Sequence, residues 1–187
     1  MFVSHLHADH FGGLPFLILD GQFRRRTRPL TIAGPAGIAR RLHDALELSF
    51  PGSAAVERRF PVNVVELAPG AAEVAGLPVT AFEVDHPSGA PPLALRLTVA
   101  DRTVAYTGDT AWTPVLPVLT DGADLLIAEA YSFTKPIPYH LSHHDLVTHR
   151  SRLTSRRIIL THPGPDMLAH RAEAAFDLAY DGLTVTV

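Results

Sequence analysis

Ser4-His5-Leu6-His7-Ala8-Asp9-His10, residues 4–10, places three histidines and one aspartate in seven consecutive positions. In an extended segment the side chains of His5 and His7 project to the same side, so both can reach one metal ion. Asp9 and His10 follow where the chain must turn, and they can face a second ion. Imidazole nitrogens with a hard carboxylate oxygen suit zinc, manganese or iron, and chemistry at a two-metal site is usually hydrolytic. The alternative is a histidine-rich surface loop. The spacing of the residues and the matching ligands downstream argue against it.

The composition limits the class of protein. The chain has 187 residues, enough for one domain with a hydrophobic core, and 47% of them are hydrophobic against 19% charged, as in a globular protein. A net charge of −3 gives no overall attraction to nucleic acid or to an anionic membrane. Because there is no cysteine, disulfides and thiolate ligands are excluded, and any metal has to bind histidine and carboxylate.

Targeting signals are absent from the sequence. No stretch approaches the roughly twenty apolar residues that a membrane span requires, and the first residues lack the basic and apolar regions of a signal peptide. A cytoplasmic location is therefore expected, with no role for a membrane.

The hydrophobic pattern predicts a single α/β domain over residues 1–187, with no internal repeat or linker. Strands are expected at 2–3, 30–33, 62–67, 77–84, 93–99, 103–106, 125–128, 158–160 and 183–187. Helices are expected at 14–19, 38–50, 114–119, 142–153 and 169–179. Gly34-Pro35 is expected to form the turn into the second helix, and a glycine- and alanine-rich turn is expected between 67 and 77.

Further candidate ligands stand where predicted strands end. His86 follows the strand ending at Val84, Asp109 follows the one ending at Tyr106, and His162 follows the one ending at Leu160. Polar groups at the carboxyl ends of strands gather at one rim of an α/β sheet. A single histidine after a strand is more often structural, but the ordered series after the opening cluster favours a metal site.

This series resembles the ligand series of the metallo-β-lactamase superfamily: the opening His5-to-His10 motif, then His86, then Asp109 in Gly108-Asp109-Thr110, and finally His162. The resemblance runs through nearly the whole chain and implies a metallo-β-lactamase-like αββα sandwich. It implies two divalent metal ions, zinc first and manganese as the alternative. It assigns His5, His7 and His86 to one ion, and Asp9, His10 and His162 to the other, with Asp109 bridging. Hydroxide between ions about 3.5–4 Å apart would be the nucleophile.

Within the superfamily, Glu129-Ala130 and His140-Leu141-Ser142 are similar to the branch that contains ribonuclease Z and small phosphodiesterases. In that branch a histidine outside the metal shell contacts the phosphate and protonates the leaving oxygen, and a glutamate orients it. The matching residues here are His140 and Glu129, which with Asp9 form the candidate catalytic set. Two departures flank the glutamate, since Ala128 and Tyr131 replace the histidine and threonine of the family.

The resemblance also bears on substrate and partners. The tRNA-processing enzymes carry a long arm between the ligands that match His86 and Asp109, whereas only a short hairpin fits here. A small phosphodiester is therefore expected rather than tRNA, and a homodimer is possible. Two alternatives stay open: an acyl hydrolase for lactones or thioesters at the same metal centre, and an inactive truncated relic.

The front of the family fold is expected to be incomplete. The family places several strands before its histidine cluster, and only four residues precede it here. Such a sheet would expose an edge and an apolar face, so poor solubility or poor metal loading is expected of this length of chain.

Overall fold

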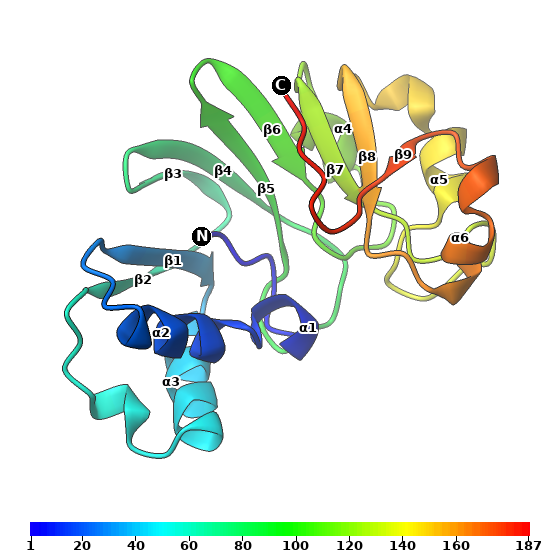
Figure 1. Cartoon of the computed structure of the whole chain (residues 1–187). Helices are drawn as coiled ribbons and strands as arrows, with labels where there is room; N and C mark the ends of the chain where they lie inside the picture. The colour runs from blue at the N-terminus through cyan, green and yellow to red at the C-terminus, as the bar shows by residue number, and fades with distance from the viewer. The chain divides into compact units, whose positions relative to one another are not determined.

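Strands of the chain form two separate sheets, one of two strands and one of seven (Figure 1). The computed structural model describes residues 1–187, which divide into two units. Unit 1 comprises residues 1–68 and 88–91, and unit 2 comprises residues 69–87 and 92–187. Both units contain helices as well as strands, which confirms the predicted α/β class. The expectation of one domain over the whole chain stays a prediction.

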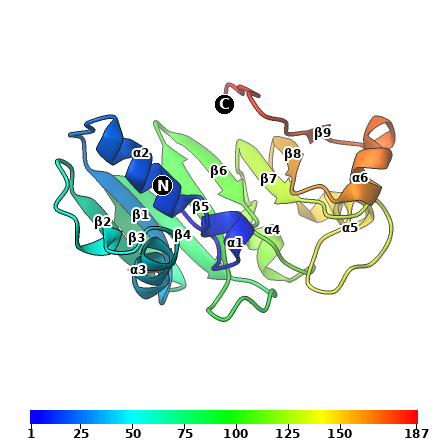
Figure 2. The ribbon, with the colours of Figure 1, turned by 60° about the horizontal axis from the view of Figure 1, so that its bottom comes forward.

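Unit 1 is a parallel strand pair with helices beside it (Figure 2). Its elements are α1 (Ala8–Phe11), α2 (Leu14–Phe23), β1 (Leu30–Pro35), α3 (Ile38–Ser49), the 3-10 turn η1 (Ser53–Ala55) and β2 (Val62–Leu67). β1 pairs with β2 in parallel from Leu30 opposite Val62 to Pro35 opposite Leu67. The predicted strand at 2–3 is a single parallel bridge from Phe2 to Ala33.

The core of unit 1 holds the opening segment in place. In α3, Ile38, Leu42 and Leu46 recur every four residues and are all buried, as the helical spacing predicts. Leu6 and Phe11, which alternate with the candidate ligands, are buried in the same apolar cluster. Burying a side chain of this size contributes about 1.5–3 kcal/mol, so these two residues anchor the histidine segment to the unit.

The predicted turn at Gly34-Pro35 is wrong. Both residues belong to β1, because its pairing with β2 continues to Pro35 opposite Leu67, and the turn falls at Gly37, whose φ is +86°. Gly34 is needed for another reason. A Cβ there would lie 2.5 Å from Ile38 Cδ1 and 3.1 Å from Val3 Cβ, so glycine permits the close packing of α3 on the strand.

Unit 2 contains the seven-stranded sheet, in the order β3-β4-β5-β6-β7-β8-β9. Its elements are β3 (Gly70–Val74), β4 (Leu77–Glu83), β5 (Leu93–Val99), β6 (Arg102–Tyr106), α4 (Val115–Leu119), β7 (Leu125–Glu129), α5 (His143–Thr148), η2 (Arg150–Arg152), β8 (Arg157–Thr161), α6 (Pro165–Ala169), η3 (Arg171–Glu173) and β9 (Asp177–Leu178). The pairs from β3 to β6 are antiparallel, and those from β6 to β9 are parallel. β4, β6, β7 and β8 therefore run in one direction and end at the same edge of the sheet.

The central strands of unit 2 are present where they were predicted, and they are buried. Leu125 and Leu126 of β7, and Ile158 and Ile159 of β8, are at most 5% exposed. Continuous apolar runs of this kind are typical of parallel strands covered on both faces. A rigid, apolar centre thus supports the polar groups at the strand ends.

The glycine- and alanine-rich turn predicted between 67 and 77 is wrong, because most of it is β3. This strand forms a hairpin with β4 through Ala75 and Gly76, whose φ angles are +51° and +80°. Two consecutive residues with positive φ match the twist of a tight hairpin. Glycine and alanine have low strand propensity, so the local composition does not predict a strand here. β3 is an edge strand that forms because it pairs with β4.

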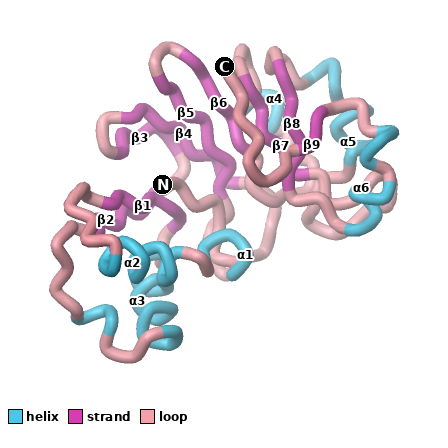
Figure 3. Tube along the Cα trace, viewed as in Figure 1, coloured by secondary structure: helices cyan, strands magenta, loops and turns pink.

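Two predictions near the C-terminus are also wrong. The expected helix at 169–179 is replaced by α6, which begins earlier at Pro165, and by β9, which adds to the open edge of β8. The expected strand at 183–187 forms no regular element (Figure 3), because the outer edge of β8 is already paired with β9. Pairing with β8 overrides local propensity here. The helix expected at 142–153 is shorter, with α5 followed by η2. No helix in the chain has the length and apolar content of a membrane span.

Candidate metal centre

The opening segment of unit 1 brings its imidazoles together by local geometry. The ring centroids of His5 and His7 lie 4.8 Å apart, and those of His5 and His10 lie 4.0 Å apart. His5 is fully buried, and its Nδ1 is hydrogen bonded to Ser4 Oγ at 3.1 Å. A hydrogen bond at Nδ1 leaves Nε2 as the coordinating atom and fixes the ring.

The turn that follows His7 is α1, a single helical turn. The backbone N–H groups of His10 and Phe11 donate to the carbonyl of His7, so the chain reverses directly after the second histidine. His10 Nε2 lies 3.7 Å from Asp9 Oδ2. The segment thus offers imidazole and carboxylate donors from one short stretch, and the predicted turn at Asp9 and His10 is present.

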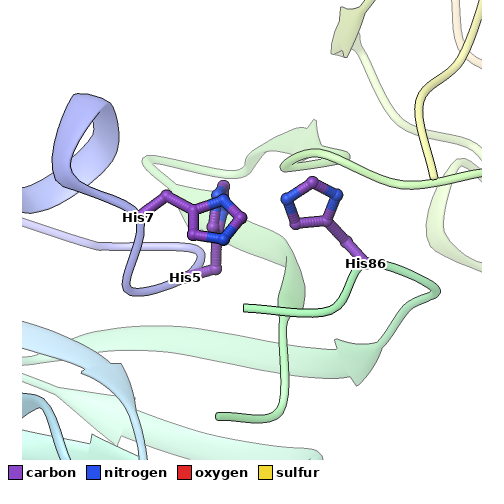
Figure 4. A group of neighbouring side chains, drawn as sticks. All are labelled: His5, His7 and His86. Atoms are coloured by element: carbon purple, nitrogen blue, oxygen red, sulfur yellow. The ribbon is translucent and has the colours of Figure 1, made fainter. Parts of the chain in front are cut away.

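Figure 4 draws three of the predicted ligands as sticks. His5 and His7 come from the opening segment of unit 1, with their rings edge to face at 83°, and His86 comes from the loop after β4 in unit 2. His86 Nδ1–H donates to the carbonyl oxygen of Tyr139 at 3.0 Å. This bond leaves Nε2 of His86 as the atom that can coordinate a metal.

The edge of the sheet in unit 2 gathers a second set of donors. Asp109 follows β6, Glu129 is the last residue of β7, His162 follows β8, and His140 lies in the loop between β7 and α5. The ligand atoms of these four residues all lie within 4.8 Å of one another. Because parallel strands end at a common edge, residues far apart in the sequence meet there.

His162 adopts a strained backbone conformation. Its φ is +55°, in the left-handed region that a histidine rarely enters. Its Nε2 lies 3.5 Å from Asp109 Oδ2, and its Nδ1 lies 3.7 Å from Glu129 Oε2. Strained residues of this kind persist where the surrounding structure holds them, and they cluster at functional sites.

Glu129 is the centre of the hydrogen-bond network in unit 2. Its side chain is fully buried, and Oε2 lies 2.9 Å from His140 Nδ1. Oε1 accepts the backbone N–H groups of Thr110 and Leu141. The carboxylate therefore ties the loop of Asp109 to the loop of His140, and a buried charge with this many donors is well satisfied.

The same network raises the pKa of His140. The hydrogen bond to Glu129 raises the pKa of His140 above its usual value, although burial works in the opposite direction, and the negative charges of Glu129 and Asp109 raise it further. Asp109 Oδ2 lies 3.9 Å from His140 Nδ1. With Nδ1–H held by Glu129, the other ring nitrogen is the one that can donate a proton outward.

The donor set of each unit fits a divalent metal of the zinc type. Imidazole and carboxylate donors suit zinc and manganese, and no thiolate is present. Bond lengths of about 2.0–2.1 Å place the ligand atoms of a tetrahedral zinc about 3.3 Å apart. The 3.5 Å separation between His162 Nε2 and Asp109 Oδ2 is close to that spacing. The sharing of ions between ligands of the two units stays a prediction.

Several supporting residues were not predicted from the sequence. Thr107 Oγ accepts the backbone N–H of Glu129 at 3.0 Å, and Thr110 Oγ accepts that of Asp85 at 3.1 Å. The threonines on either side of Gly108-Asp109 were the available signal, since hydroxyls beside a ligand commonly brace its loop. Asp85 itself is exposed and joins the site through its backbone only.

His143 is a structural residue. Ser142 caps α5 through the N–H of Asp145, and the Asp145 carboxylate accepts the N–H of Ser142. His143 Nε2 accepts the N–H of Ala175 at 2.9 Å, and its ring stacks on Phe133. Burial lowers the pKa of His143, and the neighbouring His144 adds to the effect.

Comparison with known proteins gives a consistent pattern. A family model described as "Beta-lactamase superfamily domain" matches residues 1–163. Ribonuclease Z from Shouchella clausii is 28% identical over 216 aligned positions, which cover 87% of this chain and 68% of that protein. Ribonuclease BN from Citrobacter koseri is 42% identical over 88 residues, which cover 46% of this chain.

These matches differ in their extent. The chain spans only 27% of the length of the Citrobacter koseri protein. The crystal structure of the short form of human tRNase Z aligns with a TM-score of 0.78 at 23% identity, over 100% of this chain and 78% of that chain. At this identity the structural likeness supports the fold, which is the predicted metallo-β-lactamase fold.

Proposed function

Because the chain belongs to the beta-lactamase superfamily, we propose that it is a metal-dependent hydrolase that cleaves a small phosphodiester. The observation that carries this proposal is the buried pair in unit 2, in which Glu129 Oε2 lies 2.9 Å from His140 Nδ1. A histidine whose Nδ1 is bonded to a buried carboxylate, which raises its pKa, is the arrangement of a general acid.

Ligands from both units are proposed to hold the metals. The donors in unit 1 are His5, His7, Asp9 and His10, and those in unit 2 are His86, Asp109 and His162. Their chemistry, all imidazole and carboxylate, supports two divalent cations, with zinc first and manganese as the alternative. When bound, such cations polarise phosphoryl oxygens and lower the pKa of a coordinated water.

Asp9, His140 and Glu129 have different proposed roles in the cleavage. Water supplies the oxygen that bonds to phosphorus, and Asp9 is the proposed acceptor of a proton from that water. The bond from phosphorus to the leaving oxygen breaks as His140 gives that oxygen its proton from Nε2. Glu129 keeps the imidazole oriented through Nδ1 and stabilises its positive charge. An acyl substrate does not obviously need this acid.

The proposed size of the substrate is based on the short segment between the candidate ligands His86 and Asp109. From His86 to Asp109 the only regular elements are β5 and β6, joined by Ala100 and Asp101. This hairpin leaves no room in the sequence for a protruding RNA-binding arm. A small phosphodiester is accordingly the proposed substrate, with RNA as the competing choice.

A substrate panel tests the proposal. The purified, zinc-loaded chain is assayed with bis(p-nitrophenyl) phosphate, with a lactone and thioester set, and with a precursor tRNA. We expect turnover of the phosphodiester only, and its loss in the His140→Ala variant. Turnover of lactone or thioester without phosphodiester cleavage would replace the proposal with the acyl hydrolase, and cleavage of the tRNA would correct the substrate class.

A further inference from the structure

Tyr131 lies against the candidate acid and a candidate metal ligand in unit 2. Its ring centroid is 4.9 Å from that of His140, with 33° between the planes, and 5.7 Å from that of His162, with 38° between the planes. The two imidazoles are nearly parallel to each other, at 7° and 5.7 Å. Tyr131 is half-buried, so its ring is part of this cluster of three rings rather than of the core.

The position of Tyr131 is fixed by its backbone. Its N–H donates to the carbonyl of Leu141 at 2.9 Å, and its carbonyl accepts the N–H of Gly164 at 2.8 Å. Leu141 directly follows His140, and Gly164 lies two residues beyond His162. The tyrosine is therefore tied to both of the segments whose histidines its ring contacts.

Gly164 is a glycine because of this tyrosine. A Cβ at Gly164 would lie 2.8 Å from the carbonyl oxygen of Tyr131 and 3.2 Å from its ring atoms. The φ of Gly164 is −74°, which any residue can adopt, so close approach and not backbone conformation excludes a side chain. The structure thus leaves Tyr131 no room to move toward this segment.

His140 needs a second contact to hold its ring. The hydrogen bond to Glu129 fixes Nδ1, but the plane of an imidazole can still turn about a bond made at one atom. The preceding residues of its loop, from Thr134 to Pro136, are exposed, and Tyr139 adopts a φ of +63°. The His86 ring meets the His140 ring edge to face, with centroids 5.0 Å apart, and the Tyr131 ring, tilted by 33°, packs against the face of His140 and limits the rotation of its plane.

We propose that Tyr131 is a positioning residue that fixes the plane of the His140 imidazole. The inference rests on the proposed function because His140 is taken as the general acid. The packing of Tyr131 on His140 does not depend on that function. Tyr131 departs from the resembling branch, which has threonine at the matching position. An aromatic ring is the property that counts, and the phenol hydroxyl is not required.

Kinetics of three variants test the role. Tyr131→Thr is expected to lower kcat for the phosphodiester about tenfold, a part of the hundredfold or more that general acid catalysis contributes, with KM and zinc content unchanged. Tyr131→Phe is expected to keep the wild-type kcat. If Tyr131→Thr does not fold, Tyr131→Leu replaces it and is expected to show the same tenfold loss of kcat. Tyr180→Thr, at a tyrosine that is 70% exposed, is the matched control.

Other kinetic results would overturn the inference. If Tyr131→Thr leaves kcat unchanged, the ring does not position the acid. If Tyr131→Phe is as poor as Tyr131→Thr, the hydroxyl acts directly on the reaction. A change in KM alone would make Tyr131 a substrate contact.

A spectroscopic measurement separates this inference from the proposed function. In wild-type protein the proton on His140 Nδ1, bonded to Glu129, should give a downfield NMR signal protected from exchange. We expect the signal to persist in Tyr131→Phe and to exchange rapidly in Tyr131→Thr. This result holds even if no phosphodiester is cleaved, in which case only the proposed function fails. An equally protected signal in Tyr131→Thr would overturn the positioning role.

Gly164→Ala provides an independent test of the same contact. The added methyl group should displace Tyr131 and speed the exchange of the His140 Nδ1 proton in the wild-type background. In the Tyr131→Thr background it should add little, because the two changes act on one contact. Additive effects would contradict the inference.

Discussion

The opening segment of unit 1 and the strand-end cluster of unit 2 assemble polar donors in different ways. Unit 1 holds its donors within residues 4–10, whereas unit 2 collects His86, Asp109, Glu129, His140 and His162 at one sheet edge. In unit 1 the donors depend on a short chain segment anchored by Leu6 and Phe11. In unit 2 they depend on the order and direction of the strands. The same chemistry is thus supported by local spacing in one unit and by topology in the other.

The largest effect is expected from removing the acid in unit 2. His140→Ala should lower phosphodiester cleavage by about 10²–10⁴-fold, since that is the usual contribution of general acid catalysis. The zinc content, measured by mass spectrometry, should not change. His144→Ala, at an exposed neighbour on α5, is the control and should behave as wild type. Loss of zinc with His140→Ala would instead make this histidine a ligand.

A stability measurement should separate the two kinds of assembly. Glu129→Leu leaves the N–H groups of Thr110 and Leu141 without their acceptor, so the metal-free protein should lose about 3 kcal/mol of unfolding free energy. His7→Ala, at an exposed position of the opening segment, should cost less than about 0.5 kcal/mol. Urea denaturation of both variants makes the comparison. A loss below about 0.5 kcal/mol for Glu129→Leu would mean that unit 2 does not depend on its buried carboxylate.

A smaller effect is expected where unit 1 depends on close packing. Gly34→Ala places a methyl group 2.5 Å from Ile38 Cδ1, so α3 has to shift on β1 at a cost of about 1–2 kcal/mol. Gly13→Ala has no atom within 4 Å of the new methyl group and an ordinary φ of −74°, which makes it the matched control. In thermal denaturation the melting temperature of Gly34→Ala should be well below that of Gly13→Ala. The reverse order would refute the packing argument.

The smallest effect is a pH dependence of unit 2. Burial lowers the pKa of His143 below its ordinary value of 6.5, so the unfolded chain binds a proton more readily than the folded one. The unfolding free energy should therefore fall as the pH drops below 6.5, and should be insensitive to this residue above that value. His143→Gln should flatten the slope, as measured by urea denaturation from pH 5 to 8. An unchanged slope would exclude His143 as its source.

Sequence patterns predicted what local spacing controls. The helix predicted at 38–50 and the strands predicted at 125–128 and 158–160 are present as α3, β7 and β8. The histidine segment was also readable, because its ligands are near neighbours. The strand ends that carry Asp109 and His162 were found because strands leave a clear hydrophobic signal.

Features that depend on distant partners were missed. β3 is made by pairing with β4, and β9 by pairing with β8, although neither segment has a strong strand pattern. The contact of Tyr131 with His140 and His162 joins three positions across 32 residues, which no local pattern encodes. The same holds for the acceptance of the His86 proton by the Tyr139 carbonyl.

The metal content of the purified protein tests most directly whether the two units serve one centre. Mass spectrometry of the zinc-loaded wild type should find about two zinc ions per chain, as in other two-metal hydrolytic sites. His5→Ala in unit 1 and Asp109→Ala in unit 2 should each reduce this number. Retention of both ions after either substitution, or a wild-type chain that binds no zinc, would contradict the account.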